Sequence, residues 1–206
     1  MKPKTVTEIR LLGGHPALDF ANTVDARRDR WGPDALATYG DLVTWGERVE
    51  VIDPALAQQL RREGAAEPSE ASAALERAKA ARELLYLVFL AEVRGAVVEP
   101  ADSAALGRLV DGALAQRALV PIPQGFAWGW TDGGLDAVLH RVVLVAADLL
   151  ASRSDRRAVR ECPGANCGWL FLDRSRGGRR HWCSDETCGT RSRVERFRTK
   201  AGKDAS

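Results

Sequence analysis

The chain has 206 residues, of which 45% are hydrophobic and 28% are charged. This composition is typical of a globular protein with enough apolar material for a core, and the length fits one domain of ordinary size plus a small appendage. The longest apolar run, residues 84–91, is far shorter than the roughly eighteen residues that span a bilayer. Because the first residues also lack the apolar core of a secretory signal, the sequence excludes a membrane protein and predicts a cytoplasmic one.

The formal net charge of +2 is the sum of two parts of the chain that have opposite net charges. Residues 153–206 hold 14 Lys and Arg against 7 Asp and Glu, a net charge of +7. Residues 1–152 hold 16 basic and 21 acidic side chains, a net charge of −5. A basic module beside an acidic domain favours a polyanion as partner. A solvated arginine-rich surface, or a basic tail docked on its own acidic domain, would give the same pattern.

The first 152 residues are predicted to form a mainly helical domain. A first helix is expected after Gly13-Gly14, with Pro16 in its first turn. Asp53-Pro54 is a helix start, and Gly64 is expected to end that helix. The remaining helices are predicted by apolar periodicity over residues 36–49, 70–94, 102–116 and 135–151. Residues 118–131 are β-prone and predict a short hairpin, whose first strand is confined to an edge by its prolines.

Three polar residues near the Gly-Gly break form a candidate ligand pocket: His15, Asp19 and Asn22. Asp19 and Asn22 lie three residues apart and are therefore close on one helix face. Helix capping and turn formation explain Asp19 and Asn22 equally well and are the stronger interpretation. Trp128 and Trp130 are likewise interpreted as packing residues and not as a ligand cage.

All four cysteines lie in the last quarter of the chain, as Cys162-x4-Cys167 and Cys183-x4-Cys188. Two close pairs of thiolates suit one structural Zn²⁺ ion, which takes tetrahedral sulfur ligation. Disulfides would need an oxidising compartment, and the same spacing also admits a redox pair or unrelated thiols. Four sulfur ligands leave no vacant position for water, so the zinc is expected to be structural and not catalytic.

Around these cysteines the sequence predicts a treble-clef-like finger over residues 153–206. Residues 153–157 are expected to form a short hinge between the helical domain and the finger, and the two parts are expected to touch. Its expected pieces are a strand, its turn and a returning strand, at residues 168–173, 174–180 and 181–183. Cys188 is placed in the first turn of a following helix that extends to Lys200. Four apolar side chains are expected to form a small core that depends on the ion: Trp169, Phe171, Val194 and Phe197.

The finger carries a basic surface formed by the turn and the helix. Its members are Arg176, Arg179, Arg180, Arg191, Arg193, Arg196, Arg198 and Lys200. These side chains suit phosphate contacts, from which one or two arginines can read guanine edges.

The cysteine segments, with Gly168-Trp-Leu-Phe-Leu-Asp-Arg-Ser-Arg176 after the first pair and Gly189-Thr-Arg-x-Arg-Val194 after the second, resemble the CGNR zinc finger family. Residues 12–24, Leu-Gly-Gly-His-Pro-Ala-Leu-Asp-Phe-Ala-Asn-Thr-Val, resemble the start of the ABATE domain that usually precedes this finger. The resemblance implies a bacterial, stress-related transcription regulator whose finger binds DNA and whose N-terminal domain senses a small molecule. Thr190 stands where the family has asparagine, so the contact made by that amide is in doubt.

We therefore predict a zinc-dependent, DNA-binding transcriptional regulator, with a homodimer or a second DNA contact expected if it selects sites. RNA binding and a zinc-stabilised protein-interaction module are the alternatives, because the same charges serve any polyanion and a zinc finger can also bind protein. An enzyme is not expected. The three histidines, His15, His140 and His181, have no nucleophile-and-base arrangement or phosphate loop around them.

Overall fold

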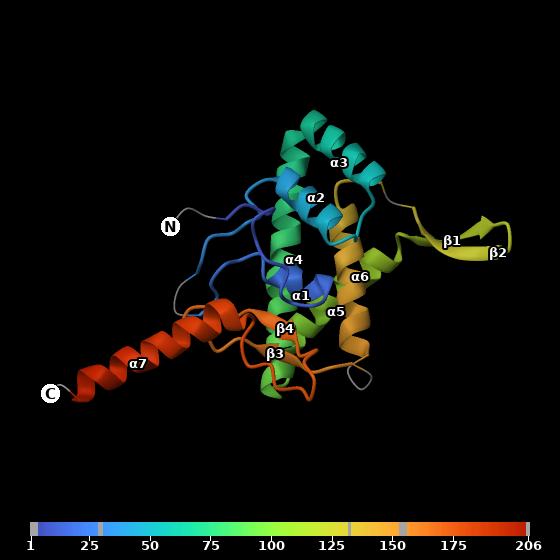
Figure 1. Cartoon of the computed structure of the whole chain (residues 1–206). Coiled ribbons are helices and arrows are strands. Elements are labelled where there is room, and N and C mark those ends of the chain that lie inside the picture. The colour runs from blue at the N-terminus through green and yellow to red at the C-terminus, as the bar shows by residue number, and fades with distance from the viewer. Residues whose placement is uncertain (1–3, 29–30, 132, 153–155, 205–206) are drawn as a thin grey trace.

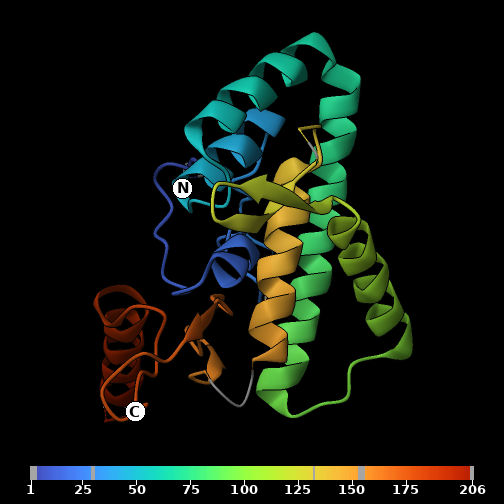
Figure 2. The ribbon, with the colours of Figure 1, turned by 90° about the vertical axis from the view of Figure 1, so that its right-hand side faces the viewer.

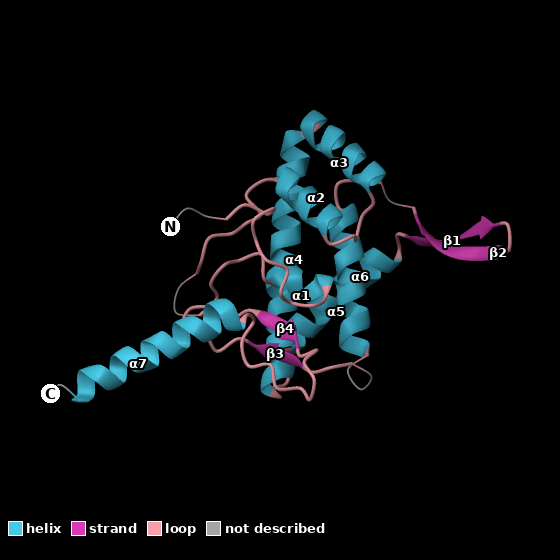
Figure 3. Ribbon diagram, viewed as in Figure 1, coloured by secondary structure: helices cyan, strands magenta, loops and turns pink. Residues whose placement is uncertain are grey.

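A computed structural model describes residues 4–28, 31–131, 133–152 and 156–204, with side chains described as far as Thr199. The chain is 53% helical, and its named strands form two separate two-stranded antiparallel sheets (Figure 3). This confirms the predicted fold class, a mainly helical N-terminal domain with a hairpin followed by a small zinc finger. The expected domain boundary falls at residues 153–155, which lie outside the described residues, and it stays a prediction.

Prolines begin four of the N-terminal helices, and the sequence predicts two of these starts, at Pro16 and at Asp53-Pro54. The bounds are α1 Pro16–Ala21, α2 Tyr39–Arg48, α3 Pro54–Ala66, α4 Pro68–Arg94, α5 Pro100–Leu114 and α6 Ala137–Ala151. Asp53 caps α3 by accepting a 2.8 Å hydrogen bond from the Leu56 N–H. Helix α4 ends at Gly95, whose φ of 63° belongs to the left-handed region that glycine adopts without strain.

Helix α3 does not end at Gly64, contrary to the prediction. It continues to Ala66 and ends because Pro68 begins α4 two residues later. A Cβ atom on Gly64 would lie 2.8 Å from Cδ1 of Tyr39. The glycine therefore lets α2 and α3 approach closely, which is a packing role that looks the same as a helix stop in the sequence.

The core of the N-terminal domain lies around α6, which packs against α1, α4 and α5 (Figure 2). Val142, Val143 and Ala146 on α6 are buried, as expected for a helix that is apolar nearly all round. Beside them the rings of Phe20 and Trp45 pack with centroids 4.8 Å apart. Among the described residues, no helix is long and apolar enough to cross a membrane.

The predicted hairpin is formed by β1 Arg117–Ile122 and β2 Gly125–Trp130, in antiparallel register with Leu119 opposite Trp128. It projects from the helical body (Figure 1). Most of its side chains are exposed, so the body supports it mainly at the Arg117–Trp130 end.

In the finger, β3 Val159–Glu161 pairs with β4 Leu170–Leu172, and one π-helical turn, η1 Asp185–Gly189, leads into α7 Thr190–Asp204. The predicted returning strand at residues 181–183 is wrong, because the partner of β4 precedes Cys162. The Cys162 N–H donates to the Trp169 carbonyl at 2.8 Å, which closes the first cysteine loop between β3 and β4. Residues 181–183 instead bring the second cysteine pair to the first.

The predicted finger core is half right. Trp169 and Phe171 are buried, but Val194 and Phe197 on α7 are 45% and 76% exposed. The N-terminal domain covers the finger core where α7 was expected to cover it. Leu12 packs against the cluster that holds Trp169 and Phe171. Leu170 and Leu172 likewise belong to the core of the helical domain.

Candidate metal centre and basic helix

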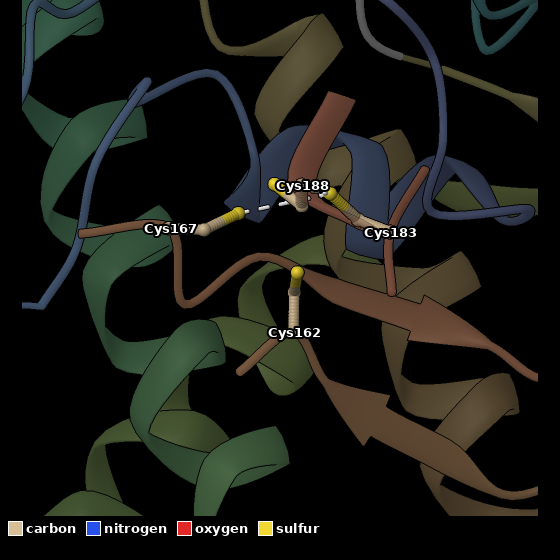
Figure 4. A group of neighbouring side chains, drawn as sticks. All are labelled: Cys162, Cys167, Cys183 and Cys188. Atoms are coloured by element: carbon tan, nitrogen blue, oxygen red, sulfur yellow. Dashed lines mark hydrogen bonds between the residues drawn. The ribbon is translucent and has the colours of Figure 1, made fainter. Parts of the chain in front are cut away.

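The four cysteine side chains converge on one point, although they come from two segments of the finger (Figure 4). All four sulfur atoms lie within 4.8 Å of one another. Cys167 Sγ is 3.7 Å from Cys183 Sγ, which is 3.6 Å from Cys188 Sγ. Four sulfurs at about 2.3 Å from a central Zn²⁺ would lie about 3.8 Å apart, so the spacing fits a tetrahedral site.

The loop between Cys162 and Cys167 is shaped for this convergence. In the first loop, Asn166 has a φ of 61°, a left-handed conformation that asparagine tolerates better than most residues. A Cβ atom on Gly164 would lie 3.1 Å from Cys188 Sγ, so a small residue is needed where the first loop passes the second cysteine pair.

The chemistry of the clustered thiols also favours a cation. Hydrogen bonds shared among the sulfurs lower the pKa of Cys162 and raise the pKa of Cys167, and four thiolates this close together would repel one another. A divalent ion stabilises the thiolate form of every ligand. The site holds one structural zinc ion, whose four positions are filled by the four cysteines.

The finger is docked on the helical domain through the backbone of β4. The Asn22 side chain donates from Nδ2 to the Leu170 carbonyl at 2.8 Å and accepts the Leu170 N–H at 2.9 Å. The Leu172 N–H donates to the Gly13 carbonyl at 2.8 Å. The segment around α1 therefore acts as an additional partner along β4.

A second set of contacts holds the first cysteine loop itself. The Trp169 indole N–H donates to the Val24 carbonyl at 2.8 Å, and the Tyr86 hydroxyl donates to the Gly168 carbonyl at 3.0 Å. The Arg27 N–H donates to the Cys167 carbonyl at 3.0 Å. The finger and the helical domain thus touch, and their contact includes the backbone of a zinc ligand.

The three residues of the candidate ligand pocket are hydrogen-bonded to backbone groups. His15 caps α1 by accepting the Ala17 N–H at 3.2 Å, and Asp19 accepts the Gly13 N–H at 2.7 Å. Burial raises the pKa of Asp19 to about 6, against the effect of the backbone N–H groups. For Asp19 this contact matches the interpretation as a local turn bond, whereas the partners of Asn22 belong to the finger. Ligand binding by these residues stays a prediction.

The structure divides the predicted basic surface into exposed and engaged side chains. Five exposed arginines form no ion pair among the described residues: Arg176, Arg179, Arg191, Arg196 and Arg198. Arg193 is also exposed but pairs with Asp185 at 2.9 Å. Arg180 is part-buried, stacks over Phe171 and donates to the Leu12 carbonyl at 2.9 Å, so it joins the finger to the helical domain. The side chain of Lys200 lies outside the described residues.

Thr190 occupies the junction between η1 and α7. Its hydroxyl donates to the Asp185 carbonyl at 3.1 Å and accepts from Arg193 Nη2 at 3.2 Å. At the position of the family's asparagine, this chain thus has a hydroxyl that ties the metal-binding turn to the basic helix.

Asp173 is a buried residue of the finger that the sequence interpretation did not single out. Its Oδ1 accepts hydrogen bonds from the Ser175 N–H and hydroxyl and from the Arg180 N–H. It thereby closes the turn that presents Arg176 and Arg179. Asp side chains often accept the backbone N–H two residues on, so Asp173 before a turn was the available signal.

A four-cysteine site set into a small β-hairpin and a following helix defines a zinc-finger protein. The CGNR zinc finger family matches residues 158–201. Residues 14–153 match the ABATE family, which is described as "putative stress-induced transcription regulator". This second match covers more than half of the chain, so the chain belongs to that family, as its resemblance predicted. No curated protein matches the sequence.

Proposed function

We propose that this protein is a DNA-binding transcriptional regulator in which α7 contacts the duplex and zinc holds the base of that helix. The observation that carries the proposal is the placement of α7, which projects away from the body of the molecule (Figure 1). Its main contact with another element is with η1, the turn that directly precedes it. Residues 190–204 contain six basic and two acidic residues, so this projecting helix is strongly positive.

The dimensions and chemistry of α7 suit a DNA groove. The major groove is about 12 Å wide and admits an α-helix. Arg191, Arg196 and Arg198 are exposed along α7 and can reach phosphates or base edges. Val194 and Phe197 are also exposed, and apolar side chains of this kind contact the methyl group of thymine.

Zinc in this proposal sets the direction of α7. Cys188 lies within η1, and the Arg193–Asp185 ion pair joins the first turns of α7 to the same element. The position of α7 relative to the body therefore depends on the second cysteine pair. Because sulfur fills every position of the ion, we infer a regulator and not a metal-dependent enzyme.

A titration of labelled duplex DNA at several salt concentrations tests the proposal. The logarithm of the binding constant should fall linearly with the logarithm of salt, with a slope near 0.9 for each phosphate contact. Replacing Arg191 or Arg198 with glutamine should weaken binding and reduce the slope by about one unit. Arg108→Gln, an exposed change on α5, is the matched control and should bind like the wild type.

Two outcomes would refute duplex binding as the role of α7. One is binding that does not respond to salt or to the α7 substitutions. The other is structured RNA that displaces the duplex at a much lower concentration than unlabelled duplex does, which would favour an RNA target. The +7 charge of residues 153–206 alone does not distinguish the two nucleic acids.

A second candidate role is a zinc-stabilised protein-interaction module, including a homodimer. It is favoured by Val194 and Phe197, whose apolar surface has no cover in the described chain. This role predicts a complex that survives moderate salt and is lost in Phe197→Ser. Sedimentation of the wild type and of Phe197→Ser at several salt concentrations would show whether the protein is a dimer or a monomer.

A further inference from the structure

A pocket of about 490 Å³ opens on the helical domain where the base of the β1–β2 hairpin meets α6. This volume lies within the range of small-molecule sites. Its polar and aromatic lining consists of Glu50, Arg117, Trp128, Trp130, Arg141 and Asp148. None of the zinc ligands lines it, and neither do the sequence-predicted ligand residues His15, Asp19 and Asn22.

Two guanidinium groups lie against one indole ring at this pocket. The Cζ atoms of Arg117 and Arg141 are 4.7 and 4.3 Å from the ring centroid of Trp130. Arg117 is also 5.7 Å from the ring of Trp128, which is 64% exposed. Cation–π contacts thus place a positive group next to an aromatic surface that remains accessible to a flat ligand.

Apart from these two indole rings, the guanidinium of Arg117 has no hydrogen-bond or ion-pair partner in the described part of the chain. Its Nε is buried without a hydrogen-bond partner there, and no ion pair to this arginine is formed among the described residues. A part-buried cation left in this state is costly unless an anion or a water completes it. A carboxylate can accept two parallel N–H groups of a guanidinium, and it is therefore the anion that suits Arg117 best.

The charge of the lining limits the ligand further. Arg117 and Arg141 are matched in number by Glu50 and Asp148, so the described lining carries no formal net charge that would attract a polyphosphate. Apolar side chains from α6 and from the segment after α2 complete the wall: Val49, Val51, Leu144 and Val145. We propose that this pocket binds a small aromatic monocarboxylate, with the ring against Trp128 and Trp130 and the carboxylate at Arg117.

The pocket also borders the part of the domain that holds the finger. Pro16, the first residue of α1, lines it, and Asn22 at the other end of α1 is hydrogen-bonded to β4. The ligand proposal itself does not depend on DNA binding, and it is tested without nucleic acid.

Indole N–H signals in a ¹H–¹⁵N spectrum of the zinc-loaded full chain provide the test. The chain has six tryptophans, and Trp128→Phe and Trp130→Phe assign the two signals of the pocket. The probes are benzoate, phenylacetate and 1-naphthoate, each compared with its primary amide. We expect the carboxylates to shift these two signals and to bind about tenfold more tightly than the amides, since a hydrogen bond to a charged group contributes about that factor.

Arg117→Gln should abolish this preference for carboxylates, whereas Arg108→Gln should leave it unchanged. Arg117→Lys, which keeps the charge and loses the fork, provides a second variant if glutamine disturbs the hairpin, and it should weaken carboxylate binding several-fold. Three results would overturn the proposal: no probe shifts the two signals at millimolar concentration, the amides bind as well as the carboxylates, or both Arg117 variants bind like the wild type.

Discussion

Replacing Asn22 with alanine should separate the finger from the helical domain at one defined point. The Asn22 amide is 2% exposed and makes hydrogen bonds of 2.8 and 2.9 Å to the carbonyl and N–H of Leu170. Leu170 is fully buried, so the substitution leaves two buried backbone groups without partners. Each such group costs about 1–3 kcal/mol, which gives a total loss of about 2–6 kcal/mol.

This loss is large compared with the total stability of a domain, which is about 5–15 kcal/mol. Urea unfolding of the zinc-saturated protein, followed by circular dichroism and by tryptophan fluorescence, measures it. Ser72→Ala on the exposed face of α4 is the control and should change the free energy of unfolding by less than about 0.5 kcal/mol. If Asn22→Ala is as stable as this control, the contact between Asn22 and β4 does not hold the finger in solution, and the docking argument is refuted.

Three further predictions concern the zinc site, a buried carboxyl group and the helix α7. Cys183→Ser should lower zinc affinity at least about tenfold, because one of four ligands is lost. Zinc release to a colorimetric chelator measures this affinity. An unchanged affinity would contradict a four-sulfur site. Burial raises the pKa of Asp19 from 3.8 to about 6, so the folded protein binds this proton more tightly than the unfolded chain. Relative to Asp19→Asn, the wild type should therefore lose up to about 3 kcal/mol of stability as the pH rises from about 4 to 7. Urea titrations of both proteins across this pH range measure the effect. If the difference in their free energies of unfolding stays constant with pH, Asp19 is not desolvated. Phe197→Ser should change stability by less than about 0.5 kcal/mol, whereas Phe171→Ala should cost about 3–5 kcal/mol. Thermal or urea unfolding compares the two variants. A large loss of stability in Phe197→Ser would show that this side chain is part of a core.

Local signals predicted most of the helical domain because its helix starts depend on neighbouring residues. Asp53 and Pro54 begin α3, and Gly95 ends α4, through contacts within a few positions of the chain. The cysteine spacing likewise predicted the metal site. A tetrahedral ion limits how two cysteine pairs can be arranged, whatever the surrounding fold.

Long-range packing explains what the sequence did not predict. Asn22 and Leu170 are 148 positions apart, so the periodicity of α1 could not indicate that this amide faces the finger. The strand β3 has only three residues, too few for a periodic signal. Val194 and Phe197 were assigned to a core because apolar residues on a helix are usually buried, but the helical domain covers Trp169 and Phe171 in their place.

Comparing the duplex affinity of zinc-loaded and metal-free protein tests the central claim most directly. Both samples should be measured at low salt by fluorescence anisotropy, and zinc should then be restored to the metal-free sample. If zinc orders the base of α7, removal should weaken binding at least about tenfold, and zinc addition should restore it. Equal affinity of the two samples would contradict the claim that the metal site positions the helix that binds DNA.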